Sequence, residues 1–150
     1  MKPNKLTRKT SPYLLVLAIA AGLVACLQPA SAQRCQDSYI FRPEKGNLDF
    51  GKGRGWRTCS GFFFVLQDDG IVALFDRKGN AVWSLASYIR ADTLSIQSDG
   101  NVVLYKKGHP VWSTGTDNNK GAYFVIQGDG NLVVYSKHGR VLWSSDTGGI

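Results

Sequence analysis

The sequence predicts an all-β domain built from three copies of one short unit. Residues 97–105 read QSDGNVVLY, and residues 127–135 repeat them as QGDGNLVVY thirty positions later. A third, altered copy, QDDGIVALF, occupies residues 67–75. A fixed period of this length indicates a repeat architecture, in which one unit cannot bury its apolar face alone and its neighbours complete the core.

The segments between these copies support the same fold class. From residue 60 onward, short runs rich in Val, Ile, Leu, Phe and Tyr alternate with Asp-Gly, Lys-Gly and His-Gly turns, without helical periodicity. Each copy is followed, 15 or 16 residues after its Gln, by a Trp-Ser pair that begins at Trp83, Trp112 or Trp143. We expect these indoles to pack near the axis of a threefold arrangement rather than to stack on a ligand.

The first 32 residues are predicted to be a secretory signal peptide. A basic start without acidic residues precedes an apolar run at residues 14–25, which is too short to span a bilayer, and cleavage is expected after Ala32. An alternative stays open, because residues 23–26 resemble a bacterial lipobox in which Cys26 would carry a lipid anchor. Both interpretations place the domain outside the cytoplasm, without a membrane span.

The mature chain divides into an N-terminal extension, residues 33–46, and the repeat domain, residues 47–150. Residues 33–58 are rich in turn-forming sequence and are expected to be irregular, apart from a short strand at residues 48–50.

Net charge argues against a nucleic-acid partner. The whole chain carries +7, but removal of residues 1–32 leaves 14 Lys and Arg against 11 Asp and Glu, a net charge of +3. The remaining basic residues are scattered along the sequence rather than gathered in one stretch, so a nucleic-acid footprint is not predicted.

Two cysteines remain in the mature chain, and an oxidising compartment favours a disulfide between Cys35 and Cys59. The bond would fasten the N-terminal segment to the first repeat. A zinc site is not predicted, because His109 and His138 stand at no zinc-ligand spacing from these cysteines. No cofactor is expected.

The turn within each copy predicts the register of its hairpin. A three-residue loop, Ser98 to Gly100, pairs Gln97 with Asn101 and places four aliphatic residues on one face. Gly100 then takes the left-handed conformation that such a loop requires. The predicted core residues of the three units are Phe64, Leu66, Val72, Leu74, Leu94, Ile96, Val102, Leu104, Phe124, Ile126, Leu132 and Val134.

The opposite face carries the same chemical groups in two of the three copies. Each offers two amides, a carboxylate, a phenol and an aliphatic side chain between them, from Gln97, Asp99, Asn101, Val103 and Tyr105, and from Gln127, Asp129, Asn131, Val133 and Tyr135. Sugar hydroxyls both donate and accept hydrogen bonds around C–H groups, so this set matches a sugar ring. Turn chemistry alone would explain Asp, Gly and Asn, but not the shared face.

The pattern Q-x-D-x-N-x-V-x-Y, repeated at this spacing, resembles the mannose-binding motif of the bulb-type (monocot mannose-binding) lectins over about residues 47–147. The resemblance implies a β-prism II fold, with three four-stranded antiparallel sheets in pseudo-threefold symmetry, and metal-independent binding of mannose or mannose-containing glycans. It assigns the sugar 3-hydroxyl to Gln97 and Gln127, the 2-hydroxyl to the Asp and Asn of each motif, and the 4-hydroxyl to Tyr105 and Tyr135.

The chain departs from that pattern in two places. Plant members have a disulfide where this chain has Gly70 and about Asp92, so Cys35–Cys59 would be a different crosslink. The first copy keeps two motif residues but has lost three, so we expect a degenerate site there, composed of Gln67, Asp69, Ile71, Ala73 and Phe75. Its exposed apolar residues could instead serve a homodimer or another partner.

Rival functions are weaker. An enzyme is not predicted, because both histidines fall in turns and no nucleophile or carboxylate pair stands at a catalytic spacing. A β-trefoil also has three repeats, but its units are nearer forty residues. The main alternative function is a β-prism protein-interaction or surface module that does not bind sugar.

Overall fold

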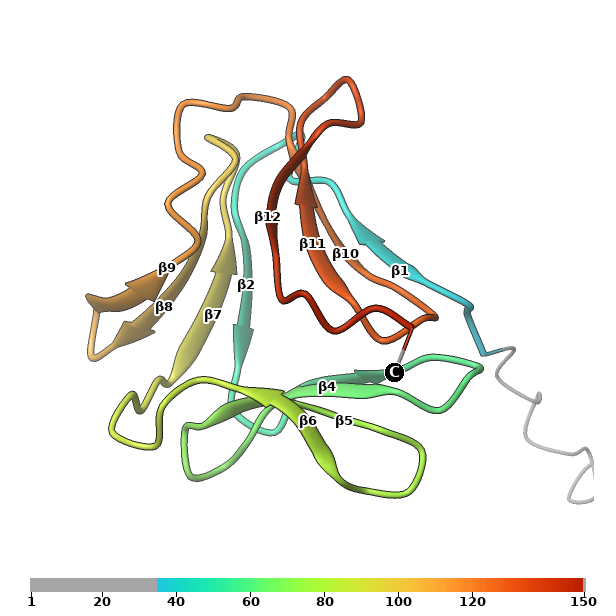
Figure 1. Ribbon diagram of the computed structural model, residues 1–150. Coiled ribbons are helices and arrows are strands. Elements are labelled where there is room, and N and C mark those ends of the chain that lie inside the picture. The colour runs from blue at the N-terminus through green and yellow to red at the C-terminus, as the bar shows by residue number, and fades with distance from the viewer. Residues whose placement is uncertain (1–34, 150) are drawn as a thin grey trace, which may run out of the picture. The chain divides into compact units, whose positions relative to one another are not determined.

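The structure, a computed structural model, describes residues 35–149. These residues form twelve strands in three four-stranded antiparallel sheets and no helix, which confirms the predicted all-β class (Figure 1). Within this range there is accordingly no helix long and apolar enough to cross a membrane. The predicted signal peptide and Cys26 lie outside the described residues.

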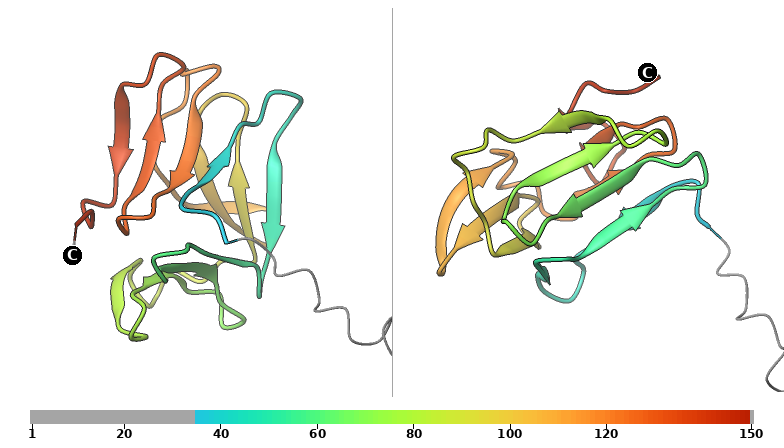
Figure 2. Two further views of the ribbon diagram at one scale, coloured as in Figure 1. Left: turned by 90° about the vertical axis from the view of Figure 1, so that its right-hand side faces the viewer. Right: turned by 90° about the horizontal axis from the view of Figure 1, so that it is seen from below.

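Each repeat supplies three consecutive strands of one sheet, and Figure 2 shows the three sheets as separate walls around a common interior. The first sheet consists of β3 (Gly55–Arg57), β4 (Phe63–Leu66), β5 (Val72–Phe75) and β6 (Ala81–Ser84). The second consists of β2 (Leu48–Gly51), β7 (Thr93–Ile96), β8 (Val102–Lys106) and β9 (His109–Ser113). The third consists of β1 (Tyr39–Phe41), β10 (Tyr123–Ile126), β11 (Leu132–Tyr135) and β12 (Val141–Ser144).

The expectation that residues 33–58 are irregular is wrong for much of this segment. Besides the predicted strand, here β2, it contains β1 and β3, and each of the three is the edge strand of a different sheet. Their aromatic side chains turn inward, where Trp56 contacts Phe50 and Phe41 edge-on at ring-centroid distances of 4.8 and 5.2 Å. Pairing with a distant repeat, rather than local sequence, makes these residues extended.

The predicted hairpin register is confirmed. Ile96 pairs with Val102 and Leu94 with Leu104, while the Gln97 backbone N–H donates to the Asn101 carbonyl. Gly100 has a φ of 99°, in the left-handed region expected of it. All twelve predicted core residues are buried.

The tryptophans confirm the predicted threefold packing. Trp143 meets Trp83 and Trp112 edge-to-face, with ring centroids 6.1 and 5.7 Å apart. All three are partly buried against the core shared by the sheets. Each indole therefore helps to close the end of the core that its own unit could not cover alone.

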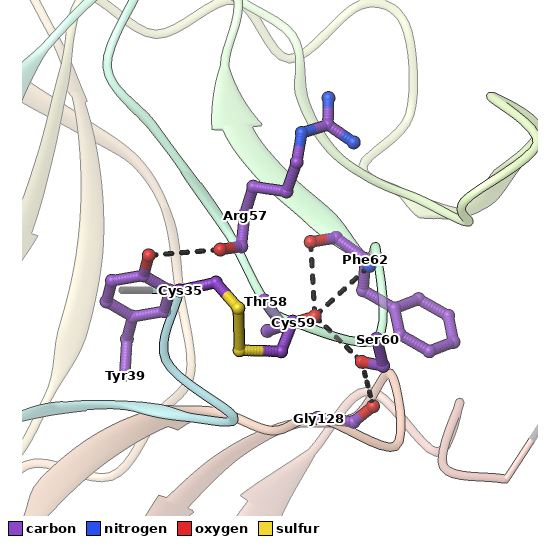
Figure 3. Close-up of a disulfide and its surroundings, with 8 residues drawn as sticks. All are labelled: Cys35, Tyr39, Arg57, Thr58, Cys59, Ser60, Phe62 and Gly128. Atoms are coloured by element: carbon purple, nitrogen blue, oxygen red, sulfur yellow. Dashed lines mark hydrogen bonds between the residues drawn. A yellow bond between two sulfur atoms is a disulfide. The ribbon is translucent and has the colours of Figure 1, made fainter. Parts of the chain in front are cut away.

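The Cys35–Cys59 disulfide is present, with the two Cα atoms 5.1 Å apart (Figure 3). It joins two short segments that also pair through an isolated bridge between Gln36 and Thr58. The Tyr39 hydroxyl adds a hydrogen bond of 3.0 Å to the Arg57 carbonyl. The predicted crosslink between the N-terminal segment and the first repeat is thus confirmed.

Candidate functional site

The predicted polar residues of the second repeat come together on the outer face of the second sheet. The Gln97 amide Nε2 donates to the Tyr105 hydroxyl at 2.9 Å. Gln97 lies next to Asn101 and Tyr105 pairs with Thr93, so this hydrogen bond passes over the intervening residues of β7 and β8. It leaves Gln97 Oε1 as an acceptor and the Tyr105 proton as a donor.

Asn101 is held in one amide orientation. Its Oδ1 accepts hydrogen bonds from the Thr114 hydroxyl at 3.0 Å and from the Thr116 backbone N–H at 3.1 Å. An amide oxygen that faces these two donors must point its Nδ2 the other way. Among the described residues no atom accepts a hydrogen bond from Nδ2, so Asn101 presents a free N–H donor at the sheet surface.

Asp99 lies at the exposed tip of the hairpin, adjacent to this amide. Its Oδ1 accepts from the Asn101 backbone N–H at 2.9 Å, which fixes the carboxylate relative to the amide. The backbone carbonyl of Asp99 accepts from Asn119 N at 2.8 Å, so the loop before β10 buttresses the turn. Gln97, Asp99, Asn101 and Tyr105 form what we call the second-repeat site.

The third sheet reproduces this arrangement, with one additional hydrogen bond to its asparagine. Gln127 Nε2 donates to the Tyr135 hydroxyl at 2.9 Å, and Asp129 Oδ1 accepts from Asn131 N at 3.1 Å. Asn131 Oδ1 accepts from Ser144 Oγ, Ser145 Oγ and Thr147 N at 3.0, 3.0 and 3.3 Å. Gln127, Asp129, Asn131 and Tyr135 form the third-repeat site.

The hydroxyl residues that orient the two asparagines were not among the predicted site residues. Thr114 and Thr116 occupy the same offsets after the Trp-Ser pair as Ser145 and Thr147. In both units the two hydroxyls contact each other at 2.7 Å, and the second donates to the carbonyl of the hairpin glycine. In both units a Ser or Thr directly after the Trp-Ser pair is followed two residues later by Thr, and this repeated pattern could have predicted their role.

The two valines lie on the predicted outer face, between the polar residues of each site, but their side chains are almost completely buried. Val103 is 4% exposed and Val133 is 1% exposed. Each valine lies on a central strand with a paired residue on either side, and the Gln–Tyr hydrogen bond of its unit passes over it. The valines therefore form the floor beneath the polar groups.

The first repeat has lost this chemistry and uses its carboxylate elsewhere. Asp69 Oδ1 still accepts from Ile71 N at 2.9 Å, but its Oδ2 forms an ion pair with Arg90 at 2.8 Å. The Ile71 hydrogen bond and then the Arg90 guanidinium hold the pKa of Asp69 below its ordinary value. Leu85 and Ser87 stand at the offsets of the orienting hydroxyls, so the asparagine and a key partner are both missing.

The expected apolar face of the first repeat is smaller than predicted. Ala73 is only 2% exposed, whereas Ile71 and Phe75 are half-buried. Phe75 pairs across the hairpin with Phe63, and the Arg57 guanidinium lies over the Phe63 ring at 4.6 Å. A charged group therefore covers part of this surface. Gln67 remains half-buried, without a phenol opposite it.

Within residues 35–149, no group of three or more His, Cys, Asp or Glu side chains is arranged to hold a metal ion.

Several solved structures share the fold. The Japanese Marasmius oreades lectin is 31% identical, with a TM-score of 0.65 over 78% of this chain and 96% of that one. A monomeric monocot mannose-binding lectin from Gastrodia elata is 27% identical, with a TM-score of 0.63 over 75% and 99%. The mannose-specific agglutinin of snowdrop (Galanthus nivalis) bulbs, complexed with methyl-α-D-mannoside, is 28% identical, with a TM-score of 0.50 over 61% and 89%.

No protein-family model matches the sequence, and no curated protein matches it significantly. The similar structures above are all lectins, in agreement with the expectation that this chain is not an enzyme. Because the 31% sequence identity to the Marasmius lectin extends over 96% of that protein, and the monocot mannose-binding lectin of Gastrodia elata shares the fold, this chain belongs to the bulb-type (monocot mannose-binding) lectin family and has its β-prism II fold.

Proposed function

We propose that this protein is a metal-independent, mannose-binding lectin with two sites per chain, the second-repeat site and the third-repeat site. The observation that carries the proposal is the duplicated hydrogen-bond arrangement. In both sheets the Gln amide donates to the Tyr hydroxyl, and a hydroxyl at the same offset orients the Asn amide, although no core requirement demands polar groups there.

The unsatisfied atoms of each site match a sugar with adjacent hydroxyls. Asn101 Nδ2 donates, Asp99 Oδ2 and Gln97 Oε1 accept, and the Tyr105 hydroxyl donates while it accepts from Gln97. In the family resemblance, the axial 2-hydroxyl of mannose lies between the Asp and the Asn. The amide donor and the carboxylate acceptor are adjacent at the hairpin tip, as that assignment requires.

The similar structures support the choice of sugar. The Gastrodia elata protein is described as mannose-binding, and the snowdrop agglutinin as mannose-specific and complexed with methyl-α-D-mannoside. All contacts proposed here run directly from side chain to hydroxyl, so the mechanism needs no metal ion as an intermediary.

We expect weak binding at each site and stronger binding to clustered glycans. About four hydrogen bonds of roughly 0.5–1.5 kcal/mol each, on a shallow surface, correspond to a dissociation constant on the order of millimolar. Two sites per chain, or four in a homodimer, raise the avidity on a mannan surface by about 10²–10⁴.

Titration with methyl-α-mannoside, with and without a chelator, tests the proposal. We expect saturable binding that the chelator leaves unchanged. The alternative function, a β-prism interaction module, predicts no binding to mannose-rich glycans by the native protein. A binding signal that disappears with the chelator would contradict the direct mechanism.

We also propose an extracytoplasmic location for the protein, with secretion and a lipid anchor at Cys26 as the two routes. The Cys35–Cys59 disulfide supports an oxidising compartment. The mass of the purified, exported protein separates the routes, because an N-terminus at Gln33 excludes an anchor at Cys26.

A further inference from the structure

A basic cavity lies beside the second-repeat site, outside the residues proposed to bind mannose. Its volume is about 360 Å³, within the range of small-ligand pockets. Its lining comes from the connection between β9 and β10 and from the loop between β11 and β12, two segments that lie at the upper end of the view in Figure 1. Among the residues that line it are Asn118, Asn119, Lys120, Lys137, His138 and Arg140.

The side chains that line this cavity carry a net positive charge, and the adjacent Asp117 carboxylate accepts from Asn118 Nδ2 at 2.7 Å. Lys120, Lys137 and Arg140 all line it, and the lining includes neither Asp nor Glu. The one ion pair among residues 35–149 joins Arg90 to Asp69 in another repeat, so none of these three cations takes part in an ion pair within that range. Three cations around one hollow, without a carboxylate in its lining, raise the local potential and favour an anionic occupant.

The cavity and the second-repeat site share a wall. Asn119 N donates to the Asp99 carbonyl at 2.8 Å, and a Cβ on Gly100 would lie only 2.5 Å from the Asn119 carbonyl oxygen. On the far side, a Cβ on Gly121 would lie 3.3 Å from Lys137 Cβ, so the loop also packs on the hairpin. A glycan seated at Asp99 can therefore extend over one short loop into the cavity.

A cavity of similar size lies beside the third-repeat site, but a carboxylate offsets its positive charge. Its volume is about 350 Å³, and Ser60, which lines it, donates a hydrogen bond to the carbonyl of Gly128 in the third motif (Figure 3). Arg77 and Lys78 line this cavity, but so does Asp76. Hydrogen bonds from Asn80 above all hold the pKa of Asp76 below its ordinary value, so it stays ionised and offsets the cations.

We propose that the cavity beside the second-repeat site binds an oxyanion ester, a phosphate or a sulfate, on a mannose-type glycan whose neutral ring occupies Gln97, Asp99, Asn101 and Tyr105. The inference rests on the proposed mannose binding and names a preferred class of glycan for one of the two sites. Planar Arg140 and the two lysines supply charge-assisted hydrogen bonds to the oxyanion.

The test compares a neutral oligomannoside with the same oligomannoside bearing a phosphate ester and, separately, a sulfate ester. Calorimetry is performed at low and high salt on the Asn131→Asp protein, in which only the second-repeat site remains. We expect at least one ester to bind about tenfold more tightly than the neutral sugar at low salt, with the advantage falling as salt rises. The two arms identify which oxyanion is preferred.

The variant Lys137→Ala/Arg140→Ala should lose the advantage for the ester and keep its affinity for the neutral sugar. The matched control, Arg77→Ala/Lys78→Ala, alters the cavity beside the other site and should change neither. If the neutral sugar binds and neither ester gains, the inference is wrong while the proposed function stands. If neutral sugar fails to bind the native protein, the proposed function fails. Ester binding that survives Asn101→Asp would also contradict the inference, because the anion would then bind without the ring.

Discussion

At the scale of single residues, one amide distinguishes the two intact sites from the altered repeat. Asn101 and Asn131 each turn Oδ1 toward hydroxyl and backbone donors and leave Nδ2 exposed. Ile71 can do neither, and Leu85 removes one of the hydroxyls that such an amide would need. The site can donate a hydrogen bond to a sugar because the amide is present and also because it is held in this orientation.

We predict that Asn101→Asp and Asn131→Asp each remove one mannose site and leave the fold intact. The substitution replaces the exposed N–H donor by a second carboxylate beside Asp99 or Asp129, so the 2-hydroxyl meets acceptors alone. Titration with methyl-α-mannoside measures the loss, and circular dichroism monitors the fold. Retained affinity in the double variant would refute the site assignment.

Thr114 is predicted to act as a positioning residue for Asn101. Thr114→Val removes a donor to Asn101 Oδ1 and the acceptor of Val102 N, so we expect about 1–3 kcal/mol of lost stability. We also expect roughly threefold to tenfold weaker binding at the second-repeat site, measured in the Asn131→Asp background. Thr114→Ser restores the hydroxyl and should rescue the affinity, whereas Ser113→Ala serves as the neighbouring control. Failure of the serine to rescue would contradict the positioning role.

At the scale of elements, the disulfide supports one binding turn and not the other. Gln36 and Thr58 pair beside the crosslink, and the Ser60 hydroxyl donates to the Gly128 carbonyl in the turn of the third motif (Figure 3). From the other side the Gly128 N–H donates to Ser38 Oγ at 3.3 Å. The two segments joined by Cys35–Cys59 therefore enclose the third-repeat turn.

The variant Cys35→Ser/Cys59→Ser is expected to weaken the third-repeat site selectively. Loss of the crosslink over about 25 residues should cost roughly 3 kcal/mol of stability in the chain-entropy model. Binding is compared in the Asn101→Asp and Asn131→Asp backgrounds, which isolate the third and second sites respectively. An equal loss at both sites would show that the disulfide acts through global stability alone.

At the scale of the whole molecule, the three sheets have the same architecture but chemically different outer faces. The three sheets share one core and one tryptophan cluster, so folding retains all three units regardless of their outer chemistry. The ion pair of Asp69 with Arg90 uses the carboxylate that the other two repeats leave exposed. The molecule is therefore symmetric in its interior and not at its surface.

We predict two equivalent mannose sites per chain rather than three. Ile71 and Phe75 remove two of four polar contacts, and two hydrogen bonds of about 1 kcal/mol each correspond to roughly thirtyfold weaker binding at an already weak site. Titration with methyl-α-mannoside gives the stoichiometry, and a crystal soaked with the sugar shows its location. A third equivalent site, or a sugar bound beside Ile71, would overturn this prediction.

The all-β class, the three units and the register of each hairpin could all be predicted from the amino-acid sequence. These properties depend on local signals: alternation of side chains across a pleated strand, and a glycine that alone tolerates the left-handed position at the tip. The same alternation placed Gln97, Asn101 and Tyr105 on one face. The cysteine pair was predictable because only two cysteines follow the predicted signal peptide.

The way in which distant segments complete each sheet and each site depends on tertiary contacts and could not be predicted from the sequence. Strands β1, β2 and β3 become extended because each pairs with a repeat far away in sequence, a contact that local composition does not encode. The same holds for Thr114 and Thr116, which reach Asn101 only when the chain after Trp112 folds back on the hairpin. The burial of Val103 was likewise not predictable, because it depends on the strands that pair on both sides of β8 and on the side chains above it, not on position along a strand.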